Sequence, residues 1–283
     1  MERIKNTLHL LRISHWSKSI FVLLGVFYAQ SKTYLIPALW AALAFCLISS
    51  AVYIYNDIQD RSEDSLHPHK SKRPLASDKF AVSDAIVLLF VLLIAGLVLG
   101  WMVSKQLALI LCAYIIINLA YNHALKLIPI LDVICIATGF MLRVLAGTIG
   151  IGLPISMWLT IAATLLSLFI ALNKRQLELR MGLKYVTRPV LKKYHPELLY
   201  WSILGSGVAC FVTYLLYTIF ARSQSFYFIL TLPFAAFALW RFAWLSDQDI
   251  ENDDPVSVFL SDRLSRFNIY CFIILTLMAL TRN

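Results

Sequence analysis

Charged residues are scarce in this sequence. Only 14% of its 283 residues are Asp, Glu, Lys or Arg, whereas 60% are hydrophobic and the mean hydropathy is +0.74. Soluble domains carry about 25% charged residues, so this composition excludes an ordinary soluble globular domain. Apolar stretches recur along the whole length. We therefore predict an all-α membrane protein with a single integral-membrane domain over residues 1–283.

Cysteine is sparse and lacks a metal-binding spacing, and we find no convincing internal repeat. The five cysteines are scattered through apolar stretches, where we expect them to pack as small hydrophobic residues rather than to form disulfides or bind metal. No basic segment stands free of the apolar ones, which argues against nucleic-acid binding. The net charge of +9 instead fits attraction to anionic membrane lipids. No cleavable signal is evident, so we expect the first apolar stretch to be a retained anchor.

The apolar stretches predict nine membrane spans, each near the roughly 20 residues that a helix needs to cross a bilayer. Before the first span, Ile4, Leu8 and Leu11 have helical spacing and predict a short interfacial helix within residues 1–14. The spans are expected at about 15–31, 38–56, 81–101, 105–122, 130–149, 155–173, 199–219, 225–243 and 266–282.

The distribution of Lys and Arg supports this topology. With the N-terminus inside, twenty of the 25 basic residues fall in inner segments, four fall outside, and Arg143 lies within a span. The positive-inside rule then places the long connections, at about 57–80, 174–198 and 244–265, in the cytoplasm. Because loops carry most functional sites, we expect a multi-pass protein of the cell membrane whose active site faces the cytoplasm.

An acidic motif leaves the end of the second predicted span. On a helix its three aspartates fall on one face, and clustered carboxylates near lipid require a compensating charge. Mg²⁺ prefers a few carboxylates together with phosphate oxygens of a substrate. The basic run that follows, with Lys70 and Arg73, would bind the rest of that phosphate. The alternative is an ordinary solvated helix end. The predicted metal ligands are Asn56, Asp57, Asp60 and Asp64.

A second polar group surrounds the short inner loop that follows the fourth predicted span. Lys126 is the sole basic residue of that loop, after Tyr121-Asn122, and Asp132 lies in the first turn of the next helix, where the helix dipole favours an anion. These residues are either ligands for a phosphate and for a metal or hydroxyl group, or a topology marker and a helix cap.

Two further groups carry positive charge. Arg143 lies about 16 Å deeper along the helix than Asp132, and an intramembrane arginine normally faces a polar cavity or an anionic partner; a structural ion pair is the alternative. After the sixth span, Lys174 and Arg175 either bind a second phosphate or belong to a solvated helix end with Glu178. Together these groups predict a central cavity, open to the cytoplasmic side, for a phosphorylated donor and a lipid-borne acceptor.

These motifs and the nine spans resemble the UbiA-type intramembrane prenyltransferase superfamily. The resemblance covers essentially the whole chain, and it depends on Asn56-Asp57-x-x-Asp60-x-x-x-Asp64 and on Tyr121-Asn122 followed by Lys126 and Asp132. It implies an all-helical bundle around a central cavity, with Mg²⁺ held by the first aspartate motif.

The sequence departs from the aromatic-prenylating members after the sixth span. Those members carry a second aspartate-rich motif there, whereas this chain has Asn173-Lys174-Arg175-Gln176-Leu177-Glu178. The change resembles the branch that makes polyprenyl-phosphoryl-5-phosphoribose. That resemblance extends to His67-Pro68-His69-Lys70 with Arg73-Pro74, to Arg143 with Ala146-Gly147, and to Asp262-Arg263. One position differs, because Asp64 is commonly followed by Arg in that branch and is followed here by Ser65.

The branch implies transfer of 5-phosphoribose from phosphoribosyl diphosphate to a polyprenyl phosphate, with release of diphosphate. Mg²⁺ would stabilise the leaving group, and Arg143 or Lys126 would orient the acceptor phosphate. The alternative is prenyl transfer from a polyprenyl diphosphate to an aromatic or other small acceptor. A lipid-phosphate transporter is disfavoured because polar groups thin out beyond Arg143. The predicted catalytic residues are Asp57, Asp60 and Arg143, and the predicted substrate ligands are Lys70, Arg73, Tyr121, Lys126, Asp132, Lys174, Arg175 and Glu178.

Overall fold

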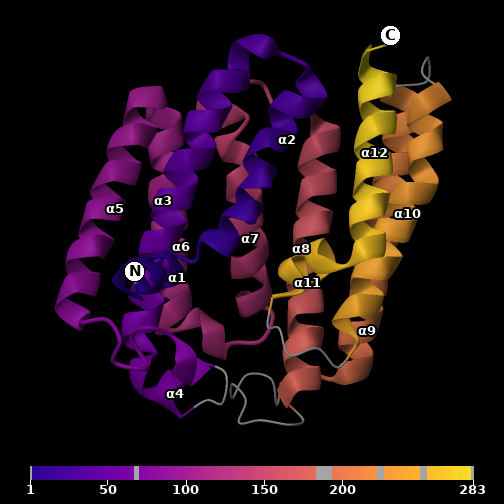
Figure 1. The fold of residues 1–283 in the computed structure, drawn as a ribbon. Helices are drawn as coiled ribbons and strands as arrows, with labels where there is room; N and C mark the ends of the chain where they lie inside the picture. The colour runs from indigo at the N-terminus through magenta and orange to yellow at the C-terminus, as the bar shows by residue number, and fades with distance from the viewer. Residues whose placement is uncertain (1, 67–69, 183–192, 222–225, 249–253, 282–283) are drawn as a thin grey trace. The chain divides into compact units, whose positions relative to one another are not determined.

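The computed structural model describes residues 2–66, 70–182, 193–221, 226–248 and 254–281 (Figure 1). Every regular element within these ranges is a helix, which confirms the all-α prediction. Nine helical segments of the described chain are long and apolar enough to cross a membrane, as predicted. They are Asn6–Ala29, Lys32–Gln59, Val82–Val103, Lys105–His123, Leu131–Ile151, Met157–Arg180, Pro196–Ala221, Phe226–Ser246 and Arg263–Thr281.

The chain divides into two compact units. The first comprises Met1–Leu125 and Leu142–Ile155, and the second comprises Lys126–Met141 and Ser156–Asn283. The first unit contains α1 (Glu2–Leu10), η1 (Ile13–Ser19), α2 (Ile20–Ala29), η2 (Lys32–Tyr34), α3 (Leu35–Gln59), α4 (Arg61–Ser65), η3 (Lys70–Lys72), α5 (Val82–Val103), α6 (Lys105–His123) and η5 (Ile149–Ile151).

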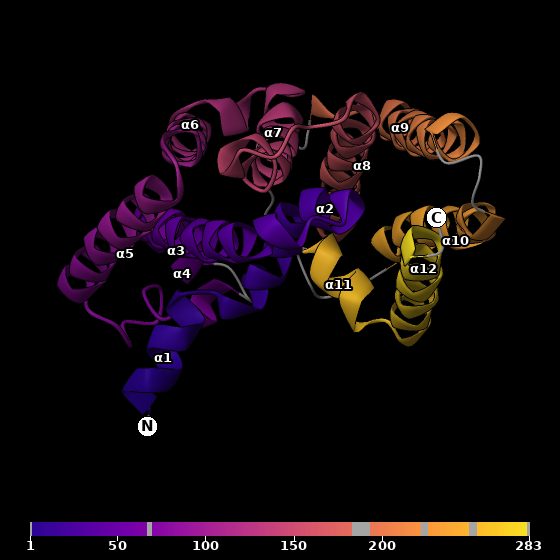
Figure 2. The ribbon, with the colours of Figure 1, turned by 90° about the horizontal axis from the view of Figure 1, so that it is seen from above.

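Helix α3 is the centre of the first unit. It packs most extensively against α5, and the two helices run side by side in Figures 1 and 2. Close approach is possible because Gly96 of α5 lies against α3, where a Cβ atom would come within 2.8 Å of the Ile48 side chain. The other face of α5 exposes Val87, Phe90 and Ile94. A helix that is apolar on its exposed face also fits contact with lipid.

The second unit begins with most of α7 (Leu131–Ala146). It continues through α8 (Met157–Gly182), α9 (Pro196–Leu216) with its π-helical end η7 (Tyr217–Ala221), α10 (Phe226–Ser246), α11 (Pro255–Ser261) and α12 (Arg263–Thr281). Helix α8 packs along α9, and α10 packs along α12 (Figure 2). At one end of the α10–α12 pair, Arg241 donates two hydrogen bonds to Asp262, at 2.9 and 3.1 Å.

The predicted connections contain more helix than expected. The segment at 57–80 includes α4 and η3, and α8 continues past residue 173 to Gly182. A helix, α1, lies within the N-terminal segment 1–14, and its predicted place at the membrane interface stays a prediction. The motif residues His67, Pro68 and His69 lie outside the described residues, as do residues 183–192 and 249–253 of the other two long connections.

Candidate active site

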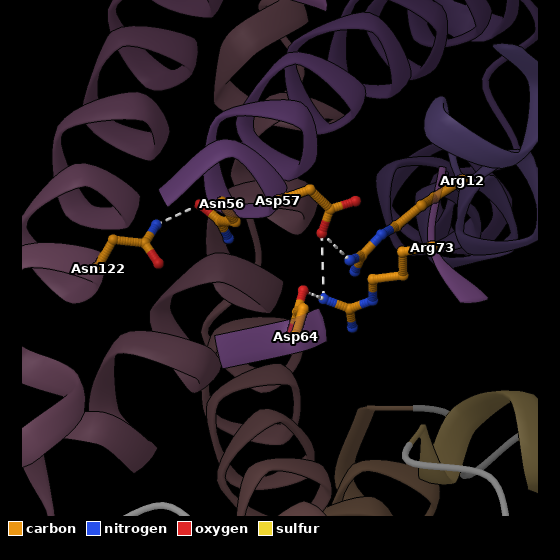
Figure 3. A network of polar contacts seen from close by, with 6 residues as sticks. All are labelled: Arg12, Asn56, Asp57, Asp64, Arg73 and Asn122. Atoms are coloured by element: carbon orange, nitrogen blue, oxygen red, sulfur yellow. Dashed lines mark hydrogen bonds and ion pairs between the residues drawn. The ribbon is translucent and has the colours of Figure 1, made fainter. Parts of the chain in front are cut away.

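The acidic motif forms a buried ion-pair network in the first unit. Asp57 and Asp64 are each only 3% exposed. One guanidinium nitrogen, Nη1 of Arg73, lies 3.1 Å from Oδ1 of Asp57 and 2.6 Å from Oδ2 of Asp64. Nη2 of Arg12 lies 2.5 Å from the same Asp57 oxygen. Figure 3 shows both arginines on one side of Asp57. Two buried carboxylates are therefore paired with two guanidinium groups.

Local backbone structure brings these side chains together. Helix α3 ends at Gln59, and the backbone N–H of Asp60 still donates to the carbonyl of Asn56, at 2.9 Å. The spacing of the aspartates predicted one continuous helix, and this prediction is wrong, because a new helix, α4, begins at Arg61. Further along, the carbonyl of Arg73 accepts hydrogen bonds from the N–H and hydroxyl of Ser77, and Leu75 is fully buried. The turn places the Arg73 side chain beside Asp57, near the end of α3.

Burial and charge have opposite effects on Asp64. Burial raises the pKa of its carboxyl group above the ordinary value, while the nearby Arg73 and Lys70 lower it. The net direction is upward, so Asp64 binds a proton more readily than an exposed carboxyl group does. Lys70, which begins η3, therefore contributes to the electrostatics of the motif, and its predicted contact with a substrate phosphate stays a prediction.

Asn56 points away from the carboxylates. Its Oδ1 accepts a hydrogen bond from Nδ2 of Asn122 on α6, so Asn56 and Asp57 face different neighbours (Figure 3). Asn122 also donates to the carbonyl of Asn118, and Asn118 donates to that of Tyr114. The spacing of four residues places these three polar side chains on one face of α6. Asn118 and Tyr114 were not among the predicted site residues. The four-residue spacing of Tyr114, Asn118 and Asn122 is the sequence pattern that could have identified them.

Arg143 makes a second set of polar contacts in the first unit, with residues of α3 and α6. Its Nη2 lies 3.2 Å from Oγ of Ser49 and 3.3 Å from the hydroxyl of Tyr114. Its guanidinium group also lies over the rings of Phe45 and Tyr114, 4.8 and 5.1 Å from their centroids. Arg143 is 5% exposed. Hydroxyl groups and aromatic faces thus surround a charge that the bilayer would otherwise make costly.

The second unit contains its own buried charge cluster. Arg175 of α8 and Asp132 of α7 are both fully buried, and Nε of Arg175 lies 2.7 Å from Oδ2 of Asp132 without the alignment of a hydrogen bond. Nη1 of Arg175 pairs with Glu178, and the hydroxyl of Tyr194 donates to Asp132. Burial and the Asp132 carboxylate both raise the pKa of Tyr194, which keeps its hydroxyl protonated. Tyr194 was missed by the sequence analysis.

The remaining predicted residues are partly buried. Asp60 follows α3, Tyr121 lies near the end of α6, Lys126 lies in η4 (Leu125–Leu127), and Lys174 lies on α8. The first unit thus holds the acidic motif, Lys70, Arg73, Tyr121 and Arg143. The second unit holds Lys126, Asp132, Lys174, Arg175 and Glu178.

The carboxylates of the first unit fit a divalent cation only in part. Within the described residues, no three His, Cys, Asp or Glu side chains are gathered as metal ligands. Asp57 and Asp64 nevertheless converge on one cationic nitrogen. Mg²⁺ is usually bound by one or two carboxylates, with water and substrate phosphates as its other ligands. Two buried carboxylates at a common cation position fit that mode of binding, in which substrate completes the site.

Comparisons with known proteins assign the chain to a family. A model of the UbiA prenyltransferase family matches residues 19–271. The chain belongs to the UbiA prenyltransferase family. It is therefore a multi-pass membrane transferase, consistent with its nine apolar helices.

Two relatives and one solved structure document the UbiA likeness. The chain is 32% identical to a decaprenyl-phosphate phosphoribosyltransferase from Mycolicibacterium smegmatis, over 79% of this chain and 74% of that protein. It is 29% identical to the protein of the same name from Corynebacterium glutamicum, over 95% and 85%. A UbiA homologue from Archaeoglobus fulgidus, solved with DMAPP and Mg²⁺, superposes with a TM-score of 0.71 at 19% identity, over 98% of this chain and 99% of that one. This last likeness establishes the shared fold.

Proposed function

We propose that the protein transfers 5-phosphoribose from phosphoribosyl diphosphate to a polyprenyl phosphate. The bond between C1 of the ribose and the diphosphate oxygen breaks, and diphosphate leaves with the electron pair. A bond forms between C1 and an oxygen of the lipid phosphate. That oxygen is already anionic, so the reaction does not require a strong general base.

The convergence of Asp57 and Asp64 on one cation position carries the proposal. A diphosphate leaving group needs positive charge where its negative charge develops. Mg²⁺ bound through these carboxylates would supply that charge. Arg73 lies at the same position and is proposed to bind diphosphate oxygens. The choice of phosphoribosyl diphosphate as donor is supported by the two relatives named as phosphoribosyltransferases.

Lys174 and Arg175 stand where other members of the family carry a second acidic motif. Basic residues at this place fit a donor that carries phosphate groups at both ends. Phosphoribosyl diphosphate carries a 5-phosphate away from its diphosphate, and Lys174 is proposed to bind it. Arg143 is proposed to orient the acceptor phosphate, which is the head group of the polyprenyl lipid. Lys70, Tyr121 and Lys126 are proposed to complete substrate binding. The excess of Lys and Arg in the inner connections supports an active site on the cytoplasmic face of the cell membrane.

The direct test incubates the purified protein with Mg²⁺, polyprenyl phosphate and phosphoribosyl diphosphate labelled in the ribose. Transfer of label into the organic phase supports the proposal, and Asp57→Asn is the inactive control. A parallel reaction contains a labelled polyprenyl diphosphate with an aromatic acceptor. Activity only in this second reaction would replace phosphoribosyl transfer by the prenyl transfer for which the family is named.

A further inference from the structure

Two arginines from different segments pair with the buried carboxylates of the acidic motif. One oxygen, Oδ1 of Asp57, meets both Arg12 at 2.5 Å and Arg73 at 3.1 Å. One nitrogen, Nη1 of Arg73, meets both Asp57 and Asp64. Figure 3 shows this chain of four alternating charges. Arg12 lies 45 residues before Asp57, and it was absent from the predicted site.

The chain segment around Arg12 is hydrogen-bonded to α3. Arg12 has a left-handed conformation, with φ of 49° and ψ of 51°, which non-glycine residues adopt only at some energetic cost. The carbonyl of the preceding Leu11 accepts a hydrogen bond from Ser50, and Ser50 in turn accepts one from Trp16. The guanidinium group lies over the ring of Tyr53, 4.9 Å from its centroid. These contacts aim Arg12 at Asp57.

Exposure differs between the two sides of the network. The side chains of Arg12 and Arg73 are 19% and 21% exposed, whereas those of Asp57 and Asp64 are 3% and 5% exposed. The arginines therefore lie at the accessible rim, and the carboxylates are fixed beneath them. Long arginine side chains can turn toward an arriving anion with little change in the backbone. The buried carboxylates need a new cation when that happens, because an uncompensated buried charge is strongly unfavourable.

We propose that Arg12 and Arg73 act as resident counter-ions that a metal–diphosphate complex displaces together. A divalent cation carries the same charge as the two guanidinium groups, so it can replace them at Asp57 and Asp64. The released arginines then bind oxygens of the diphosphate. This inference rests on the proposed metal–diphosphate site and adds Arg12 to it as a diphosphate-positioning residue.

The exchange makes the binding of metal and diphosphate cooperative. Metal alone meets two arginines that compete with it for the carboxylates. Diphosphate offers the displaced arginines a new anion, so each ligand strengthens the binding of the other, as thermodynamic linkage requires. Removing the Arg12 charge therefore has opposite effects on the two ligands. Metal alone binds more tightly, and diphosphate binds more weakly.

The test measures binding by isothermal titration calorimetry on the purified full-length protein, with Mg²⁺ alone and with inorganic diphosphate at saturating Mg²⁺. In Arg12→Gln we expect Mg²⁺ alone to bind several-fold more tightly and diphosphate to bind about tenfold more weakly. Arg12→Lys keeps the charge and should retain the weak binding of Mg²⁺ alone. Arg61→Gln is the matched control, since Arg61 pairs instead with the exposed Asp78.

The outcomes separate this inference from the proposed function. Unchanged or weaker binding of Mg²⁺ alone to Arg12→Gln overturns the exchange, even if the unaltered protein binds Mg²⁺ and diphosphate together. Absence of joint binding in the unaltered protein overturns the metal–diphosphate site itself and the exchange with it. Thermal unfolding of each variant shows whether a change in binding comes from loss of the fold.

Discussion

Nε of Arg175 and Oδ2 of Asp132 lie 2.7 Å apart, and neither side chain is exposed to solvent. The sequence presented Lys174 and Arg175 as an equivalent pair of phosphate ligands. In the structure they differ, because Arg175 is fully buried against Asp132 and Glu178 while Lys174 is only partly buried. The arginine thus neutralises buried carboxylates within the second unit, and the lysine is the one of the two that we propose to bind a substrate phosphate.

This difference predicts that substitution of Arg175 mainly lowers stability, whereas substitution of Lys174 mainly lowers activity. Arg175→Met leaves the Asp132 carboxylate without its buried cationic partner and should lower the free energy of unfolding by about 3–5 kcal/mol. Lys174→Met should leave that free energy nearly unchanged but raise KM for phosphoribosyl diphosphate at least tenfold. Chemical unfolding in detergent micelles and steady-state kinetics measure the two quantities. Equal loss of stability in both variants would contradict the division of roles.

The acidic motif gives the next prediction. Asp57→Asn and Asp60→Asn should each abolish Mg²⁺-dependent turnover, because each removes a charged oxygen ligand from the proposed metal site. Glu63→Gln is the control, since Glu63 lies within the same motif but is exposed on α4. Radiolabel transfer over a range of Mg²⁺ concentrations gives the measurement. Full activity in either aspartate variant would remove that aspartate from the metal site.

Gly147 provides a test of packing in the first unit. A Cβ atom at this position would lie 1.5 Å from the carbonyl oxygen of Val22, far inside van der Waals contact. Gly147→Ala should therefore force the end of α7 away from α2 and lower the midpoint of thermal unfolding by many degrees, or prevent folding. At Gly205 of α9 a Cβ atom meets nothing within 4 Å, so Gly205→Ala should be neutral or slightly stabilising. Similar unfolding midpoints for the two variants would disprove this packing.

The sequence predicted the spans well because the bilayer imposes a strong rule on length and polarity. All nine predicted spans correspond to helices in the described chain, and their ends differ from the predicted ones by a few residues in most cases. The larger differences lie at the starts of the first two spans, which begin at Asn6 and Lys32, and at the end of α8, which continues into polar sequence as far as Gly182. Hydropathy marks where a helix leaves an apolar environment and carries no information about where the helix itself ends.

The candidate site was predictable in composition but not in pairing. Asp57 and Asp64 were identified from clustered charge, and the structure joins them through Arg73. The contact between Arg12 and Asp57 depends on a left-handed turn and on the docking of the N-terminal segment on α3, neither of which has a periodic signal. Tyr194 was missed for a similar reason, because it reaches Asp132 from a segment 62 residues away.

Asp262 provides a prediction about pH. Two hydrogen bonds from Arg241, helped by those from Ser265, hold the pKa of Asp262 well below its ordinary value of 3.8. A lowered pKa in the folded state means that the pair stabilises the protein above the ordinary pKa and that this stabilisation is lost as pH falls through the lowered one.

Asp262→Asn should therefore lower the free energy of unfolding by about 1 kcal/mol at neutral pH, because it loses a partly buried, two-point ion pair between α10 and the start of α12. The difference from the unaltered protein should stay constant down to about pH 5 and decrease only as the pH falls below the ordinary carboxyl value. Thermal unfolding across this pH range gives the measurement. Asp78→Asn is the control, because its pairing with Arg61 is exposed and should contribute little at any pH. A difference that vanished near pH 6 would show that Asp262 has no lowered pKa and that the pair does not join the two helices.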